Sequence, residues 1–179
     1  MATTLSLEEL KNTVRAIFSK ALEAVNPYER IKDILRIEKN HLFVALDNGQ
    51  QNRLDLDSFK RVLLAGAGKA SASMARAVEE IFGDRLTMGI ITTKYGHTLP
   101  LRRTETIEAG HPIPDQKGLA ATEKMAQLLK NSGPRDLVLF LLSGGASALM
   151  PMPGNAILLQ EKQEVTQLLL HYYPRYHHR

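Results

Sequence analysis

The fold is decided by one stretch of the chain, Val62-Leu63-Leu64-Ala65-Gly66-Ala67-Gly68-Lys69-Ala70-Ser71. Its apolar residues, glycine turn and lysine predict a short strand that leads through a tight turn into a helix. Glycine permits a tight turn and the close approach of a ligand, and the free N–H groups at the start of a helix favour an anion. Lys69 adds a mobile positive charge at the same place. We therefore predict that this loop holds a phosphate group.

The alternation of strand and helix continues after this stretch. Apolar runs predict strands at residues 62–65, 88–93, 106–109 and 137–142, and helical spacing predicts helices at about 69–82 and 115–130. Asp115 is suited to cap the second of these helices. The run at 137–142 is continuously apolar, which indicates a strand covered on both faces. The pattern predicts an α/β fold: a doubly wound, mostly parallel, Rossmann-like sheet with helices on both faces, truncated at its carboxyl end.

Such a sheet brings distant loops together. In doubly wound sheets, ligands bind beyond the carboxyl ends of the strands. The loops at 66–71, 94–97, 110–115 and 143–148 each follow a predicted strand, so we expect all of them at one sheet edge. A ligand site at that edge is the main structural expectation.

The first loop departs from two standard nucleotide motifs. A P-loop has four residues between its glycines and a hydroxyl residue after the lysine, whereas here only Ala67 separates the glycines and Ala70 follows Lys69. Gly66 and Gly68 fit a dinucleotide fingerprint, but Ser71 replaces its third glycine and the next strand ends without an acidic residue. A standard NAD site is therefore disfavoured. A glycine turn beside a solvated lysine is the alternative to phosphate binding.

The second glycine loop, Ser143-Gly144-Gly145-Ala146-Ser147-Ala148, favours an anion site. Its backbone N–H groups and the hydroxyls of Ser143 and Ser147 suit a phosphate or a carboxylate, and a tight turn is again the alternative. A serine nucleophile is disfavoured, because the G-x-S-x-G pattern is absent. His111 could act as an acid or base, or hold the turn before Pro112. Asp115 is a further candidate at this edge, and no metal ligand is assigned.

The two ends of the chain lie outside this alternation of strands and helices. Ser6 and Glu9 match a capping box that opens a helix, and Pro27 is taken as the end of that helix. Residues 34–46 predict a small hairpin, and residues 161–170 predict a helix. The first helix carries an apolar stripe, which we expect to be buried, formed by Leu7, Leu10, Val14, Ile17, Phe18, Ala21, Leu22 and Val25. Residues 171–179 hold three histidines and three tyrosines without periodicity, so we expect a disordered tail rather than a zinc site.

Composition limits the class of protein. The chain has 179 residues, 44% of them hydrophobic and 23% charged, which is ordinary for one soluble domain. The net charge is only +4 and basic residues mostly stand beside acidic ones, so nucleic acid is not an expected partner. Cysteine is absent, which excludes disulfides and thiolate metal sites and fits a cytoplasmic protein. No signal peptide or membrane span is evident, so no membrane partner is expected.

At the glycine loops the sequence resembles the glycerate 2-kinase family, the type that carries a carboxyl-terminal MOFRL domain. The resemblance covers residues 5–170, which we take as the amino-terminal α/β domain, and excludes the tail at 171–179. Ala146 stands where a third glycine is common in the family. The matching motifs are Gly-Ala-Gly-Lys-Ala at 66–70, Lys-Tyr-Gly-His at 94–97, Gly-His-Pro-Ile-Pro-Asp at 110–115 and Leu-Ser-Gly-Gly-Ala-Ser-Ala-Leu at 142–149.

The resemblance implies ATP-dependent phosphorylation of D-glycerate to 2-phosphoglycerate with Mg²⁺. It implies a catalytic role for Lys69, with Gly66, Gly68 and the loop of Ser143, Gly144, Gly145 and Ser147 binding phosphate or substrate. The family continues beyond this chain, so we expect little or no kinase activity from these residues alone, and an unpaired sheet edge could promote homo-oligomers. An NAD(P)H-dependent hydroxypyruvate reductase and a non-catalytic phosphosugar- or nucleotide-binding module remain alternatives.

Overall fold

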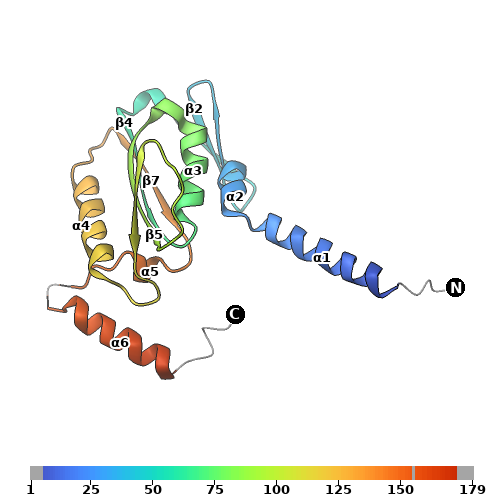
Figure 1. Cartoon of the computed structure of the whole chain (residues 1–179). Coiled ribbons are helices and arrows are strands. Elements are labelled where there is room, and N and C mark those ends of the chain that lie inside the picture. Colours follow the sequence, from blue (N-terminus) through green and yellow to red (C-terminus); the bar gives the residue numbers. More distant parts are fainter. Residues whose placement is uncertain (1–5, 155, 173–179) are drawn as a thin grey trace.

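Four parallel strands form the central sheet of the computed structural model, which describes residues 6–154 and 156–172 (Figure 1). The strands are β4 (Arg61–Ala67), β5 (Leu86–Lys94), β6 (Thr104–Ala109) and β7 (Asp136–Leu142). They lie in the order β6-β5-β4-β7, and Leu64 pairs with Gly89 on one side and Leu139 on the other. The predicted strands are confirmed, each a little longer than its apolar run. Because all four run the same way, their carboxyl ends share one edge.

Helices cover both faces of this sheet, as predicted. Helix α3 (Ser71–Phe82) packs on one face, where Val78 shares a buried core with Leu64 and Ile91. Helix α4 (Gln116–Lys130) packs on the other, where Met125 contacts a smaller core with Ala65 and Ile90. Two short turns, η2 (Gly83–Arg85) and α5 (Ala146–Leu149), follow α3 and β7. The α/β architecture with helices on both faces is therefore confirmed.

A second sheet lies beside α3. It is an antiparallel meander of β1 (Leu35–Glu38), β2 (His41–Ala45) and β3 (Gln51–Asp55), followed by the turn η1 (Leu56–Ser58). The first two strands confirm the predicted hairpin. The third was not predicted, because its sequence is polar and mostly exposed. Helix α2 (Pro27–Ile34) was also missed: Pro27, taken as the end of the first helix, occupies the first turn of this next one, with Asn26 as its cap.

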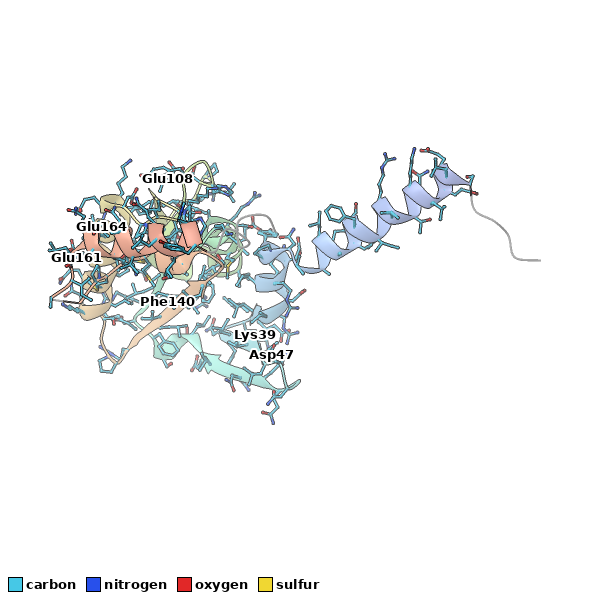
Figure 2. The ribbon with its side chains drawn as sticks, turned by 90° about the horizontal axis from the view of Figure 1, so that it is seen from below. Lys39, Asp47, Glu108, Phe140, Glu161 and Glu164 are labelled. Atoms are coloured by element: carbon cyan, nitrogen blue, oxygen red, sulfur yellow. The ribbon has the colours of Figure 1, made fainter. Side chains whose placement is uncertain are left out.

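The apolar stripe of the first helix is not buried, contrary to the prediction. Helix α1 (Leu7–Ala24) begins at the predicted capping box, in which Ser6 N–H donates to Glu9 Oε2 at 2.7 Å. None of its residues is buried in the described chain, and the side chains of Leu7 and Ile17 are 69% and 65% exposed. Both views show the helix standing away from the body (Figures 1 and 2). The spacing predicted an amphipathic helix, and nothing in the described chain packs against it.

Strand β7 is also less covered than predicted. It is one of the two edge strands, and its side facing away from α3 leaves Phe140 42% and Leu142 59% exposed (Figure 2). Helix α6 (Leu159–Tyr172) confirms the predicted helix and extends it, and its apolar residues Leu168 and Leu169 are exposed. The predicted tail at 173–179 lies outside the described residues. Among the described helices, none has the length and apolar character needed to cross a membrane.

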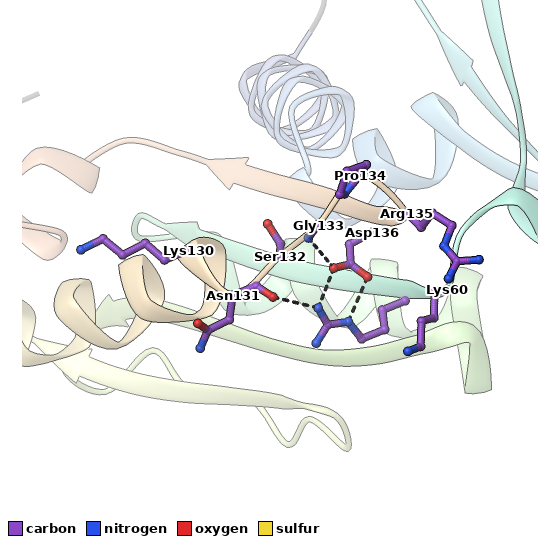
Figure 3. Close-up of a pocket in the computed structure, with 9 residues that line it drawn as sticks. Lys60, Lys130, Asn131, Ser132, Gly133, Pro134, Arg135 and Asp136 are labelled. Carbon is purple, nitrogen blue, oxygen red and sulfur yellow. Dashed lines mark hydrogen bonds and ion pairs between the residues drawn. The ribbon is translucent and has the colours of Figure 1, made fainter.

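The amino ends of β4 and β7 are joined by an ion pair, at the edge opposite the glycine loops (Figure 3). Arg61 donates from Nε to Asp136 Oδ1 at 2.9 Å and from Nη2 to Oδ2 at 2.6 Å. Gly133 N–H also donates to Asp136. The Arg61 guanidinium, together with the Gly133 N–H, lowers the pKa of Asp136 to about 2. This bidentate pair fixes the register of the two strands at that end.

Candidate functional site

The two glycine loops are bonded to each other at the carboxyl edge of the sheet. Lys69 N–H donates to Gly144 O at 2.9 Å, and Ala70 N–H donates to Ser143 Oγ at 3.0 Å. Ser143 N–H donates in turn to Ala67 O at 3.1 Å. The predicted meeting of the loops at 66–71 and 143–148 is therefore confirmed.

The glycines of the first loop are required by this close packing. A Cβ on Gly66 would lie 2.6 Å from the carbonyl oxygen of Leu141 on β7. Gly68 has a φ of +138°, and a Cβ there would lie 2.0 Å from Ser143 Oγ. The lack of a side chain at Gly66 and Gly68 therefore makes room for β7 and for the second glycine loop, and it does not open a cleft. Packing alone accounts for their residue type, while the phosphate-binding role predicted for them stays a prediction.

Ser71, which replaces the third glycine of a dinucleotide fingerprint, is buried at the start of α3. Its hydroxyl lies 2.8 Å from Gly68 O and 2.6 Å from Thr92 O, and Gly68 N–H donates to the same Thr92 carbonyl at 3.1 Å. The side chain therefore ties the first loop to the end of β5. In a dinucleotide fingerprint the third glycine lacks a side chain, whereas here the Ser71 hydroxyl occupies that position and is already hydrogen-bonded.

Lys69 and His111 meet over the second glycine loop. Lys69 is exposed, and its Cε lies 3.8 Å from the place a Cβ of Gly144 would occupy. The corresponding point at Gly145 lies 3.4 Å from Lys69 Cγ and 2.7 Å from His111 Cδ2. Gly145 has a φ of +93°, so glycine is favoured there by the backbone as well. The structure thus brings together Lys69, His111 and the loop at 143–148.

The second loop presents backbone N–H donors beside Lys69. Among residues 6–154 and 156–172, the N–H groups of Gly144, Gly145 and Ser147 donate to no backbone acceptor. Ser147 is exposed, whereas the Ser143 hydroxyl oxygen already accepts from Ala70 N–H. Successive free N–H groups beside a lysine form a concave, positively polarised surface suited to an anion. Gly144, Gly145 and Ser147 are therefore better placed to bind a ligand than Ser143.

Asp115 joins the remaining two loops of this edge. As predicted, it caps α4, with Gly118 N–H donating to Oδ1 at 2.8 Å. Tyr95, which follows β5, donates its hydroxyl to Oδ2 at 2.7 Å. Partial burial acts to raise the pKa of Asp115, but the bonds from Gly118 and Tyr95 outweigh it and hold the pKa below its usual value. The bond to Asp115 conversely raises the pKa of Tyr95.

Tyr95 is the residue that sequence reasoning missed. It lies in the Lys-Tyr-Gly-His motif, so the signal was present, but a single exposed tyrosine after a strand gives no reason to expect a carboxylate partner twenty residues away. No group of three His, Cys, Asp or Glu side chains able to hold a metal occurs in the described part of the chain. The site is therefore built from backbone N–H groups, one lysine, one histidine and a tyrosine–aspartate pair.

Residues 13–172 match the sequence pattern of a family described as Domain of unknown function (DUF4147). The chain belongs to this family. It is similar to the D-glycerate 2-kinase of Thermotoga maritima, with 37% identity over 164 residues that cover 91% of this chain and 35% of the relative. It is also similar to a putative hydroxypyruvate reductase of Agrobacterium vitis, with 44% identity over 110 residues that cover 62% of this chain and 25% of the relative.

Solved structures agree with this placement in the DUF4147 family. The crystal structure of glycerate kinase from Thermotoga maritima superposes with a TM-score of 0.71 at 34% identity, covering 92% of this chain and 35% of that one. A protein from Pyrococcus horikoshii superposes with a TM-score of 0.76 at 30% identity, covering 94% and 36%. The resemblance to the amino-terminal part of glycerate 2-kinases is confirmed. The chain spans about a third of the length of these relatives.

Proposed function

We propose that this chain carries part of the active site of an ATP-dependent glycerate 2-kinase, which phosphorylates D-glycerate to 2-phosphoglycerate. One observation supports this most: Lys69 lies over a loop with three N–H groups that have no backbone acceptor in the described chain, at the carboxyl edge of a sheet shared with glycerate kinases. Phosphoryl transfer needs mainly positioning and neutralisation of charge on the phosphoryl oxygens. A lysine and fixed N–H donors supply both without reorganising during the reaction.

Each residue has a distinct role in this proposal. Lys69 contacts the transferring phosphoryl group or the carboxylate of glycerate as the catalytic residue. Gly144, Gly145 and Ser147 bind an anionic group through their N–H donors. Gly66, Gly68 and Ser143 shape and lock the two loops. His111 and Asp115 border the same edge.

Mg²⁺ enters the proposal with ATP and is assigned no ligand in this chain. Mg²⁺ in phosphoryl-transfer sites is held by one or two carboxylates and the substrate phosphates. Asp115 and Glu108 both lie at this edge; both oxygens of Asp115 already accept hydrogen bonds, and Glu108 Oε1 accepts one from Gly96 N–H. No residue of the loops is therefore assigned to the metal, and no step is derived through it.

The kinase proposal predicts that the 179-residue chain binds ATP but forms little or no 2-phosphoglycerate. The chain spans about a third of the relatives' length, so groups from the remaining two thirds would complete the active site. We expect the 179-residue chain to bind ATP, followed by the NMR signals of Gly144 and Gly145, and to form little or no 2-phosphoglycerate in a coupled assay. Lys69→Ala should weaken ATP binding about tenfold, as expected for the loss of a charge-assisted contact.

A matched control and two outcomes make this test decisive. Lys130→Ala removes a lysine at the other end of the molecule, beside the pocket of Figure 3, and should leave ATP binding unchanged. Absence of ATP binding by the wild-type chain, or equal affinity in Lys69→Ala, contradicts the proposed site. Rapid turnover of glycerate by the wild-type chain contradicts the proposed dependence on further residues.

The alternatives are tested in the same way. Two relatives from Agrobacterium vitis bear the name putative hydroxypyruvate reductase, at 44% and 40% identity. The engaged Ser71 in place of a third glycine disfavours a dinucleotide there. Oxidation of NADH or NADPH by hydroxypyruvate, seen as a loss of nicotinamide absorbance, would favour the reductase. Thermal stabilisation by sugar phosphates but not by ATP or glycerate would favour a non-catalytic binding module.

A further inference from the structure

The loop at 110–115 is held in place by one carboxylate that serves two purposes. Asp115 accepts a hydrogen bond from Gly118 N–H at 2.8 Å, which caps α4. It accepts a second one from the Tyr95 hydroxyl at 2.7 Å, which plays no part in the helix cap. Gly110 packs against the same side chain, because a Cβ there would lie 3.1 Å from Asp115 Cγ. The cap needs only the first of these bonds. The bond to Tyr95 instead connects the 110–115 loop to the end of β5.

Tyr95 is held firmly enough to act as an anchor, although it is 43% exposed. The Lys117 ammonium lies 5.3 Å from the centre of its ring, on the same first turn of α4. Its neighbour Gly96 donates from N–H to Glu108 Oε1 at 2.6 Å, which fixes the turn to β6. The phenol thus joins the end of β5 to the start of α4 across the mouth of the sheet edge.

The opposite end of the 110–115 loop carries His111 against the second glycine loop. The His111 ring lies 2.7 Å and 2.8 Å, at Cδ2 and Nε2, from the point where a Cβ of Gly145 would stand. Gln163 of α6 donates to Pro114 O at 2.8 Å and steadies the middle of the loop. Asp115 and His111 thus stand at the two ends of one loop, one end bonded to Tyr95 and the other packed on Gly145.

We propose that Tyr95 and Asp115 are positioning residues that set His111 over Gly145 and so set the affinity of the 143–148 loop for a phosphate group. The proposal rests on the proposed function for the identity of the ligand, not for the position of His111. Displacements of about 1 Å in a binding site are enough to change rates and affinities strongly.

The test uses Tyr95→Phe in the 179-residue chain with inorganic phosphate as the probe. Removal of the hydroxyl should shift the NMR signals of the His111 imidazole and the Gly145 N–H before any ligand is added. The dissociation constant for phosphate should rise about three- to tenfold, because His111 would no longer be held at the same place over Gly145. Asp115→Asn, which retains a good helix cap, should produce the same signal shifts.

Tyr28→Phe is the matched control. Tyr28 also donates its hydroxyl to a carboxylate, that of Glu80, but between α2 and α3. This variant should leave the signals of His111 and Gly145 and the phosphate affinity as in the wild type. A purely structural role for Tyr95 would lower the melting temperature without moving those signals.

The outcomes separate this proposal from the proposed function. Unchanged His111 and Gly145 signals in both Tyr95→Phe and Asp115→Asn would overturn the positioning role, whatever the phosphate affinity. If the wild type binds no phosphate, the proposed function fails, and the signal shifts still decide the position of His111. Shifted signals with an unchanged phosphate affinity would overturn the claim that His111 tunes the loop.

Discussion

At the scale of single residues, the surroundings of Gly144 and Gly145 account for the two glycines of the second loop in different ways. Gly145 has a positive φ and stands against the His111 ring, whereas Gly144 has open space, with only Lys69 Cε at 3.8 Å from its absent Cβ. The two neighbouring glycines therefore differ in what they permit. The positive φ and the His111 ring both favour glycine at position 145, whereas the Gly144 N–H stands beside Lys69 without a backbone acceptor in the described chain.

Gly145→Ala should consequently cost both stability and binding. The left-handed backbone should lower the free energy of unfolding by about 1–2 kcal/mol, and the new methyl should push His111 aside. Urea denaturation measures the first effect and phosphate titration the second. Gly144→Ala is the matched control and should alter the free energy of unfolding far less. Equal losses in the two variants would show that His111 and the positive φ do not matter.

At the scale of elements, parallel strands made the candidate site predictable. Parallel strands end at one edge of the sheet, so the strand pattern of the sequence alone predicts that the loops at 66–71 and 143–148 meet. The contacts within the edge could not be predicted, because Gly68 touches Ser143 and Tyr95 touches Asp115 across long stretches of sequence. Local spacing missed β3 because it is a polar edge strand. Helix α2 was missed because Pro27 was taken as the end of the first helix, whereas it opens the next one.

The pairing of β4 with β7 also makes a prediction about pH. Asp136 has a side chain only 5% exposed and a pKa of about 2, below the ordinary 3.8, because Arg61 and the Gly133 N–H bind its charged form. A lowered pKa stabilises the fold fully above the ordinary value, and this stability is lost as the pH falls from about 4 toward 2. Asp136→Asn should therefore be less stable than the wild type at pH 6, and the difference should shrink over that window.

Chemical denaturation at several pH values provides this measurement. Asp84→Asn is a suitable control, because Asp84 also pairs with an arginine, Arg103, but its side chain is 99% exposed. Solvent screens such a pair, so its loss should change stability little at any pH. A stability difference for Asp136→Asn that stays constant from pH 6 to pH 2.5 would contradict the role given to the ion pair.

At the scale of the whole molecule, three surfaces lack a covering layer in the described chain. They are the stripe of α1, the outer side of β7 and the apolar side of α6, which together expose many large apolar side chains. Most of the stability of a helix in a protein comes from packing of its apolar face, and α1 lacks such packing in the described chain. The apolar spacing that predicted burial was correct about amphipathicity, and the chain spans only about a third of its relatives' length.

These exposed surfaces predict concentration-dependent association of the 179-residue chain. The α1 stripe should contribute most, because its apolar side chains form one continuous row on a helix that touches little else. Ile17→Glu places a charge in the middle of that row and should shift the chain toward the monomer in light scattering at increasing concentration. Ser19→Glu adds the same charge on the polar side of the same helix and should leave association as in the wild type. Equal association of the two variants would show that the stripe of α1 is not the contact, and a monomer at every concentration would show that none of the three surfaces is self-adhesive.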